Sequence, residues 1–379
     1  MEARVPRRIL IVAGEASGDR HAARLVEALR ERGAIEAWGV AGPALERAGV
    51  RRIARSGELA VVGFTGVLAR LPRILGIERR VLRAAAELEP ELAVLVDSPG
   101  FNFRIGPRLA RRGVKVFYYI APQVWAWHAE RAAQMSRWVD RLAVVFPFEE
   151  PLFRDAGVDA HFVGHPLLED LAPELPGAAL RARLGLPPEA RLVGLLPGSR
   201  RGELKAHLGT MLATARALCA ARSDVTALVA VAPGLEGLVP AELHDPASRV
   251  RAAAGLTHAV QAASECCVVA SGTATLETAL LGTPLAVVYR TSRINYAIAR
   301  RVVRLERIGL PNIVAGEEVA PEYLQDAFTP RALLPQLARW LDDPEARDAQ
   351  RAKLKLVRDR LGGPGASRNA AARAWELLA

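Results

Sequence analysis

Residues 266–290 read "CCVVASGTATLETALLGTPLAVVYR" and hold the pattern that decides the fold. A short apolar run ends in a Ser-Gly-Thr turn, a helical stretch follows, and Gly282 and Pro284 stop that stretch before a second apolar run begins. Glycine and proline in this order are typical of a helix end. The stretch therefore predicts a strand, a helix and a second strand.

The same alternation recurs along most of the chain. Further apolar runs lie at 9–14, 92–97, 114–122, 141–146, 191–199 and 225–231, with helical segments between them. Short, fully apolar strands that alternate with helices indicate parallel sheets covered on both faces. The predicted fold class is α/β.

The series of strands breaks once, at "EDLAPELPGAALRARLGLPPEA", residues 169–190, which is rich in Pro, Gly and Ala. A chain of 379 residues is also long enough for two domains of ordinary size. We therefore expect one α/β domain over 1–166, a second over 167–344, and a helical segment over 345–379.

Composition limits the class of protein. Apolar residues make up 51% of the chain, yet no run reaches the about 18 residues of a membrane-spanning helix. The apolar run near the N-terminus is short and enters a charged loop, so it predicts a first strand rather than a secretion signal. Cys219, Cys266 and Cys267 show no metal-binding spacing, which favours reduced, buried thiols in a cytoplasmic protein.

The net charge of +10 is carried almost entirely by arginine. Such a balance indicates an anionic partner: a nucleic acid, a phosphorylated ligand or a membrane surface. Codon bias is the alternative. A nucleic-acid-binding protein would gather its basic and aromatic residues on one surface, whereas here the arginines are dispersed, so we expect no nucleic-acid partner.

Ligands of open α/β sheets bind beyond the carboxyl ends of the strands, so the loops after strands are the candidate sites. The first, "AGEASGDRH" at 13–21, has glycines that allow close backbone approach, and Ser17 and Asp19 can cap the following helix. It lacks the GxGxxG pattern of a dinucleotide site. A plain strand-to-helix turn is the alternative.

The second loop, "VDSPGFNFR" at 96–104, places Asp97 at the end of an apolar strand. A partly desolvated carboxylate at such a position can take a proton from a hydroxyl group, because burial raises its basicity. The alternative is an aspartate that caps the turn or the next helix.

The third loop, "YYIAPQVWAWH" at 118–128, contains Trp125 and Trp127 in a chain with only 5% aromatic residues. Large aromatic side chains with a polar edge suit the face of a sugar or an acyl chain. Core packing is the alternative for each of these residues.

Two loops of the second half favour a nucleotide. In "LLPGSRRGELKAH" at 195–207, an arginine pair follows a Gly-Ser turn, which suits a phosphate, although the P-loop pattern is absent. In the opening stretch, Ser271, Gly272 and Thr273 precede a helix N-terminus, which attracts anions. Glu277, farther along that helix, can accept hydrogen bonds from two ribose hydroxyls.

Residues 59–80 carry apolar side chains at helical spacing, with arginines largely on other faces. This pattern is typical of a helix that lies in a membrane interface. An ordinary amphipathic helix packed on the core is the alternative.

Taken together and in this order, these loops resemble those of the lipid-A-disaccharide synthases. The matching elements are "AGEASGD", "ELAVVGFTGVL", "VDSPGFN", "APQVWAW", "FPFE", "FVGHP", "LLPGSR", "SGTATLE", "YR" and "LPNI", spread from residue 13 to residue 313. The resemblance implies the GT-B fold of glycosyltransferases, with two facing Rossmann-like domains.

The resemblance also implies a reaction. The family joins UDP-2,3-diacylglucosamine to 2,3-diacylglucosamine 1-phosphate, with inversion, to form a β-1,6-linked disaccharide 1-phosphate and UDP. It does so without a metal ion or other cofactor, at the cytoplasmic face of the inner membrane. Residues 59–80 then become a membrane-docking segment, and the last helices either cross back to the first domain or are exchanged within a homodimer.

The resemblance assigns roles to single residues. Asp97 is the expected general base, and the expected contacts to the acceptor or to an acyl chain are Glu15, Ser17, Trp125 and Trp127. The expected contacts to the UDP-sugar are Arg200, Ser271, Gly272, Thr273, Thr275, Glu277, Tyr289 and Asn312.

The sequence departs from the family pattern at Gly100, where an acidic residue is usual, so we expect a mechanism that relies on Asp97 without a second carboxylate beside it. The nearest alternative is another GT-B enzyme that uses a UDP-sugar, such as a peptidoglycan-type glycosyltransferase or a UDP-sugar epimerase. Such an enzyme would share the nucleotide loops but would not need "VDSPGFN" beside "VWAW".

Overall fold

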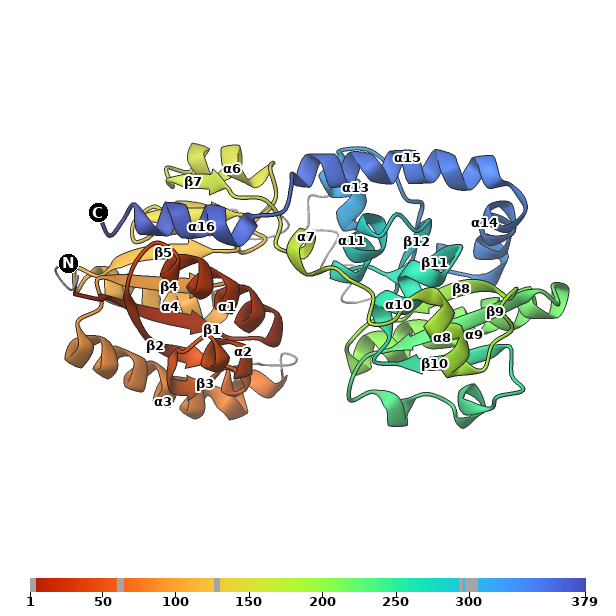
Figure 1. Cartoon of the computed structure of the whole chain (residues 1–379), viewed down its shortest axis with the longest axis horizontal. Coiled ribbons are helices and arrows are strands. Elements are labelled where there is room, and N and C mark those ends of the chain that lie inside the picture. Colours follow the sequence, from red (N-terminus) through yellow and green to blue (C-terminus); the bar gives the residue numbers. More distant parts are fainter. Residues whose placement is uncertain (1–4, 60–64, 126–129, 293–295, 297–305) are drawn as a thin grey trace. The chain divides into compact units, whose positions relative to one another are not determined.

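The chain forms two compact units in a computed structural model (Figure 1). The structure describes residues 5–59, 65–125, 130–292, 296 and 306–379. The first unit contains residues 1–169 together with 363–379, and the second contains residues 170–362. The last helix of the chain therefore belongs to the first unit, whereas the helix before it belongs to the second.

A seven-stranded parallel sheet forms the centre of the first unit, in the order β3-β2-β1-β4-β5-β6-β7. Its strands are β1 (Arg7–Ala13), β2 (Ile35–Ala41), β3 (Arg51–Arg55), β4 (Leu92–Val96), β5 (Lys115–Tyr119), β6 (Arg141–Val144) and β7 (Ala160–Phe162). Its helices are α1 (Ala16–Arg30), α2 (Pro43–Arg47), α3 (Thr65–Leu88), α4 (Pro99–Ala110), α5 (Glu130–Met135), α6 (Glu149–Asp155) and α16 (Ala366–Trp375), and α7 (Leu167–Asp170) spans the boundary.

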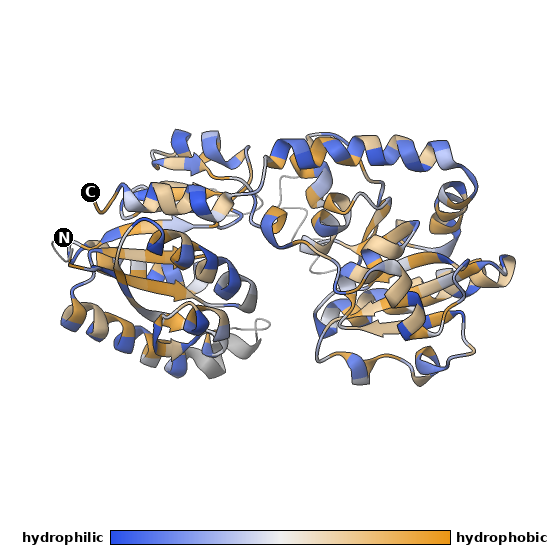
Figure 2. Ribbon diagram, in the orientation of Figure 1, coloured by the Kyte–Doolittle hydropathy of each residue, from blue (hydrophilic) through white to orange (hydrophobic). Residues whose placement is uncertain are grey.

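Helices cover both faces of this sheet because successive strand residues point to opposite faces. Leu10 and Val12 pack with Ile77 of α3 and Ile105 of α4 in one core. On the other face, α1 packs beside α16 (Figure 1). Apolar residues gather on the strands while the helices carry polar outer faces (Figure 2).

The second unit has a six-stranded parallel sheet in the order β10-β9-β8-β11-β12-β13. Its strands are β8 (Arg191–Leu196), β9 (Val225–Val231), β10 (Val250–Ala254), β11 (Cys266–Ala270), β12 (Leu285–Tyr289) and β13 (Glu322–Leu324). Its helices are α8 (Gly177–Leu184), α9 (Arg201–Ala221), α10 (Thr257–Ala263), α11 (Thr273–Leu280), α13 (Leu310–Ala315), α14 (Pro330–Asp342) and α15 (Pro344–Leu361).

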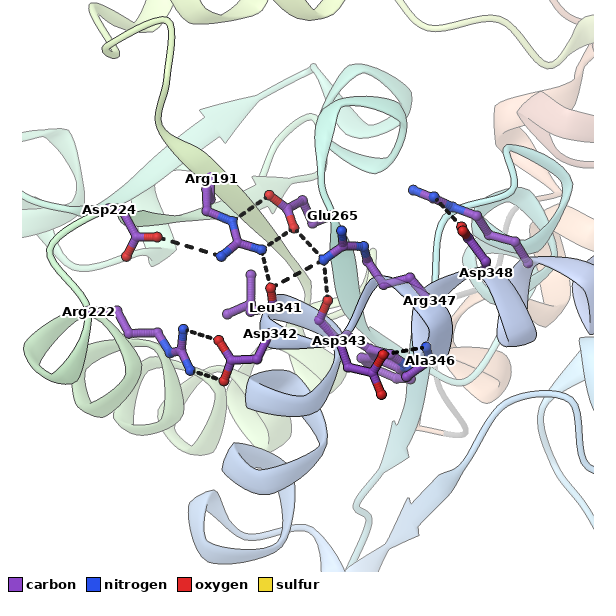
Figure 3. A network of polar contacts seen from close by, with 12 residues as sticks. Arg191, Arg222, Asp224, Glu265, Leu341, Asp342, Asp343, Ala346, Arg347 and Asp348 are labelled. Atoms are coloured by element: carbon purple, nitrogen blue, oxygen red, sulfur yellow. Dashed lines mark hydrogen bonds and ion pairs between the residues drawn. The ribbon is translucent and has the colours of Figure 1, made fainter.

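Polar contacts fasten α14 and α15 to the amino ends of the strands in this unit (Figure 3). Arg191, at the start of β8, donates to both carboxylate oxygens of Glu265 at 2.7 and 2.6 Å. Arg347 of α15 donates to the same carboxylate at 3.1 Å, and Arg191 also donates to the Leu341 carbonyl of α14. The network lies at the strand ends opposite to those that carry the candidate site.

Several expectations can be compared directly with this fold. The α/β class with two parallel-sheet domains is confirmed. The boundary falls after residue 169 rather than after 166, and α15 packs in the second unit while α16 packs in the first. All three cysteines are buried and free of disulfides.

The amphipathic segment at 59–80 lies partly outside the described residues. Its C-terminal part is helical within α3, where Ile74 packs against the core and both Arg73 and Arg80 contact Glu58 at 3.4 Å. Among the helices that the structure describes, none is both long and apolar enough to cross a bilayer.

Candidate active site

The candidate residues follow the central strands of each sheet. In the first sheet the strand order reverses between the neighbours β1 and β4, and in the second between β8 and β11. At such a switch point the loops from the two strands diverge to opposite faces and leave room for a ligand. Gly14 and Asp97 follow the first pair of strands, whereas Arg200 and Ser271 follow the second pair.

Asp97 lies in an unusual turn. Asp97 and Ser98 have φ angles of 46° and 43°, a left-handed conformation that costs a residue other than glycine about 1–3 kcal/mol. The Asp97 carbonyl accepts hydrogen bonds from the Asn102 amide at 2.6 Å and the Tyr118 hydroxyl at 2.5 Å. The Asp97 N–H donates to the Tyr119 carbonyl at 3.0 Å. These hydrogen bonds hold the strained backbone and thereby fix the position from which the Asp97 side chain extends.

The Asp97 carboxyl is a stronger base than an ordinary aspartate. Burial and, second, the negative charge of Glu15 raise its pKa to about 6, while a hydrogen bond with the Ser98 backbone opposes the shift. A group with a pKa near the working pH is suited to proton transfer. Glu15 itself is exposed at the start of α1.

The loop after β1 makes room for the Asp97 turn. A Cβ atom added to Gly14 would lie 2.2 Å from the Ser98 hydroxyl oxygen, so only glycine allows this close approach. A Cβ at Gly100 would meet nothing within 4 Å. A Cβ atom at this position would therefore meet no clash.

The capping expectation for Asp19 is wrong in its target. The buried Asp19 carboxylate accepts from the backbone N–H groups of Gly42 at 2.7 Å and Ala44 at 2.8 Å, so it caps α2 rather than α1. Ser17 lies exposed on the first turn of α1, and the side chain of the N-cap residue, Glu15, makes no capping hydrogen bond.

The aromatic residues at the end of β5 and in the loop after it differ in burial. Tyr118 and Tyr119 are completely buried strand residues, so the core interpretation holds for them. Trp125 is partly buried and donates from its indole N–H to Glu149 at 2.9 Å. Trp127 lies outside the described residues.

Glu149 was missed by the sequence analysis, although its motif "FPFE" was noted. Burial raises the pKa of this carboxyl to about 7, and the hydrogen bonds from Trp125 and from the backbone of Phe146 and Val145 oppose the shift. The carboxylate thus fastens the loop that carries Trp125 to the end of β6.

In the second unit, Arg200 is the N-cap residue of α9 and is exposed. Its guanidinium donates to Glu203 at 3.0 Å, and the other oxygen of Glu203 accepts from the Ser199 N–H at 3.0 Å. The Glu203 carboxylate thus accepts hydrogen bonds from backbone N–H groups of the turn that was predicted to bind a phosphate. Arg200 lies at the surface, beside the turn.

The turn after β11 uses some of its hydroxyl groups internally. Ser271 donates to the Ile308 carbonyl at 2.9 Å, and the fully buried Thr275 donates to the Gly272 carbonyl at 2.7 Å. Gly272 has a φ angle of 148°, which favours glycine. Thr273 is exposed at the first position of α11, where helix amide groups lack intrahelical partners. Ser271, Gly272 and Thr275 therefore shape the turn that presents Thr273.

Glu277 lies one turn farther along α11 and is partly buried, with a carboxylate oxygen 3.5 Å from Nε2 of His258. Tyr289 ends β12, and its pKa is raised by burial and by the charge of Glu203. The charge of Arg200 acts on Tyr289 as well, in the opposite direction, so Tyr289 lies near the turn that carries Arg200 and Glu203.

Asn312 is a buried structural residue. Its amide donates to the Ala320 carbonyl at 2.7 Å and to Glu322 at 2.8 Å, and its oxygen accepts from the Val319 N–H at 2.8 Å. These bonds commit the side chain to the loop before β13. The Asn312 amide, which was expected to contact the UDP-sugar, is thus already bonded within the protein.

His207 was also missed and connects two of these loops. This buried imidazole contacts the Pro197 carbonyl through Nδ1 at 2.8 Å, and Nε2 accepts from the Arg290 N–H at 3.0 Å. It ties the turn after β8 to the end of β12. Within the described part of the chain, no three acidic, histidine or cysteine side chains gather to hold a metal ion.

Comparison with known proteins identifies the class. The chain is similar to a solved glycosyltransferase of kitacinnamycin, with a TM-score of 0.65 and 15% identity over 98% of this chain and 99% of that one. It is equally similar to a putative UDP-N-acetylglucosamine 2-epimerase from Listeria monocytogenes, with a TM-score of 0.64 and 16% identity over 99% and 96%. At these identities the likeness shows the fold alone, which is the GT-B type.

The sequence comparisons are more specific. A family model described as Lipid-A-disaccharide synthetase matches residues 9–374. A lipid-A-disaccharide synthase of Anaeromyxobacter dehalogenans is 45% identical over 96% of this chain and 95% of its own length. That of Syntrophus aciditrophicus is 44% identical over 98% and 97%. The chain is therefore an enzyme of the glycosyltransferase class, and it belongs to the lipid-A-disaccharide synthase family.

Proposed function

We propose that this chain condenses UDP-2,3-diacylglucosamine with 2,3-diacylglucosamine 1-phosphate to give the β-1,6-linked disaccharide 1-phosphate and UDP. The observation that carries the proposal is Asp97, a carboxyl with a pKa of about 6 in a strained turn at the switch point of the first sheet. Family membership supports the choice of substrates.

In the proposed step, the Asp97 carboxylate removes the proton of the acceptor 6-hydroxyl. The oxygen then attacks the anomeric carbon of the donor from the face opposite UDP, and the bond from that carbon to the diphosphate oxygen breaks. Its electron pair leaves with UDP, so the anomeric configuration is inverted. One base is sufficient for this displacement, and Gly100 leaves Asp97 without a second carboxylate on α4's first turn.

The nucleotide is assigned to the second unit. Arg200 and the N-terminus of α11 at Thr273 are the proposed diphosphate contacts, since a guanidinium and helix amides both favour phosphate oxygens. Glu277 is the proposed acceptor for the ribose hydroxyls. Tyr289 and the Ser271 turn give this region its shape.

Replacing Glu277 with Gln, or Arg200 with Ala, should weaken UDP binding by about 10- to 100-fold each, because each change removes charged hydrogen bonds worth about 1.5–3 kcal/mol. Isothermal titration calorimetry with UDP measures this. Glu236→Gln, an exposed change in the same unit, should leave the affinity unchanged. If neither site variant differs from the parent, the nucleotide has been assigned to the wrong loops.

The function itself is tested by incubating the purified chain with both substrates and detecting the disaccharide 1-phosphate by mass spectrometry. We expect product and stoichiometric UDP. If no disaccharide forms, the proposed function is wrong. Epimerisation of UDP-N-acetylglucosamine would favour the alternative enzyme class.

Acylated substrates also require contact with a lipid surface. We place the enzyme at the cytoplasmic face of the inner membrane, with residues 59–80 as the docking segment. Their amphipathic sequence and the net charge of +10 support this. Cosedimentation with anionic vesicles should fall when apolar residues of this segment are made polar, and unchanged sedimentation would exclude it as the dock.

A further inference from the structure

His258 lies between two carboxylates in the second unit. It belongs to the first turn of α10, and its Nε2 is 3.5 Å from Glu277 while its Nδ1 is 3.6 Å from Glu174. The backbone of Ala172 also contacts it. The imidazole is half-buried, so water screens these contacts only partly.

The second carboxylate is itself fixed in place. Glu174 accepts hydrogen bonds from the backbone N–H of His258 at 3.3 Å and of Ala259 at 2.7 Å, so it caps α10. It belongs to the segment that follows the boundary between the units at residue 170. A ring held on one side by this cap presents its other nitrogen to Glu277 in a defined direction.

The charge of the ring decides whether both contacts are favourable. A protonated imidazole donates from both nitrogens, whereas a neutral one keeps a single N–H and turns a lone pair toward one of the carboxylates. The contact with Glu277 raises the pKa of His258 most, burial opposes it, and the charges of Glu277 and Glu174 add to the increase.

Two arginines on the elements around α10 are engaged elsewhere. Arg181 of α8 donates to the carbonyls of Gly177 and Ala190. Arg251 of β10 donates to the carbonyls of Ser248 and Leu184. The groups that shift the pKa of His258 are those of Glu277, Glu174 and Ala172.

We propose that His258 is a positioning residue for the nucleotide: it holds the Glu277 carboxylate in the orientation that accepts the ribose hydroxyls. The inference rests on the proposed function, because it acts through Glu277. Since the pKa is raised in the folded protein, the ion pair is complete below the ordinary histidine pKa and is lost as pH rises through the folded value. UDP affinity should fall over that same interval.

The test is calorimetric titration of the full chain with UDP from about pH 6 to about pH 9. We expect the affinity of the parent to fall by about three- to tenfold across this range. His258→Gln should show the weaker affinity at every pH, and His258→Lys, which stays charged, should restore it and remove the pH dependence. Glu174→Gln should move the transition to lower pH, because one negative charge beside the ring is gone.

His244→Gln, an exposed change in the same unit, is the matched control and should keep the affinity and pH dependence of the parent. If His258→Gln binds UDP like the parent, with the same pH dependence and the same melting temperature, the inference is wrong and the proposed function stands. If Glu277→Gln also binds UDP normally, the ribose assignment fails and the inference fails with it.

Discussion

Asp97→Asn is expected to slow disaccharide formation by about 10²–10⁴-fold, the usual contribution of a general base. The amide is nearly the same size as the carboxylate and preserves the turn, but it cannot take the acceptor proton. UDP affinity should stay within about twofold of the parent, since the nucleotide contacts are assigned to the other unit. Single-turnover assays with both substrates and UDP titration measure the two effects separately.

The control is Asp155→Asn, which removes an exposed carboxylate of α6 in the same unit and should leave the rate unchanged. The Asp97 variant should also fold at least as stably as the parent above about pH 6. Because burial raises the pKa of Asp97, ionising it costs folding free energy as pH rises, and the amide has no such cost. A stable variant with undiminished turnover would eliminate Asp97 as the base.

The same assignment sets the pH profile of the parent. The base must be ionised, so kcat/KM should fall tenfold per pH unit below about 6 and level off above it. Because the charge of Glu15 contributes to the raised pKa, Glu15→Gln should move this inflection to lower pH. An inflection that persists unchanged in Glu15→Gln would mean that another group controls the acid limb.

The fold was predictable where burial is uniform. The central strands β1, β4, β8 and β11 are apolar on both faces and stand out as runs. The edge strands β3 and β13 do not: β3 is "RRIAR" and β13 has three half-buried residues. These strands are defined by pairing with a neighbour, which a local pattern does not contain.

The candidate site was predictable to the level of loops. Strand ends identified Asp97, Arg200 and the Ser271 turn, because a ligand site in this fold depends on topology. The partners of these residues were not predictable. Glu203 occupies the amide groups beside Arg200, and His258 reaches Glu277 from another helix, since such contacts join side chains that only the folded chain brings together.

The motif "VDSPGFN" of the first unit contains a second residue with a structural role. In "VDSPGFN" the sequence analysis used only the aspartate, yet Asn102, the last residue of the motif, is completely buried and bonded to the turn. Its amide donates to the Val96 carbonyl at 3.3 Å and to the Asp97 carbonyl at 2.6 Å. The spacing within the motif thus links Asp97, the proposed base, to the side chain that holds its backbone.

Asn102→Ala should therefore lower kcat by about 10²-fold, the cost of misplacing a catalytic group by about 1 Å. Without the amide, the Asp97 carbonyl keeps the hydrogen bond from the Tyr118 hydroxyl but loses the one from Asn102. We therefore expect the carboxylate to move. UDP affinity should not change. Rates at saturating substrate, compared with UDP titrations, measure this.

Loss of a buried hydrogen bond also lowers stability, by about 1–3 kcal/mol, so the control must share that effect. Ser367→Ala removes the hydroxyl of a buried residue on α16 that donates to the Glu169 carboxylate at 2.7 Å in the same unit. We expect a comparable decrease in melting temperature with kcat unchanged. If the two variants lose stability and turnover in parallel, Asn102 acts only on folding. If Asn102→Ala keeps full turnover, the remaining hydrogen bonds to Tyr118 and Tyr119 suffice to hold the turn.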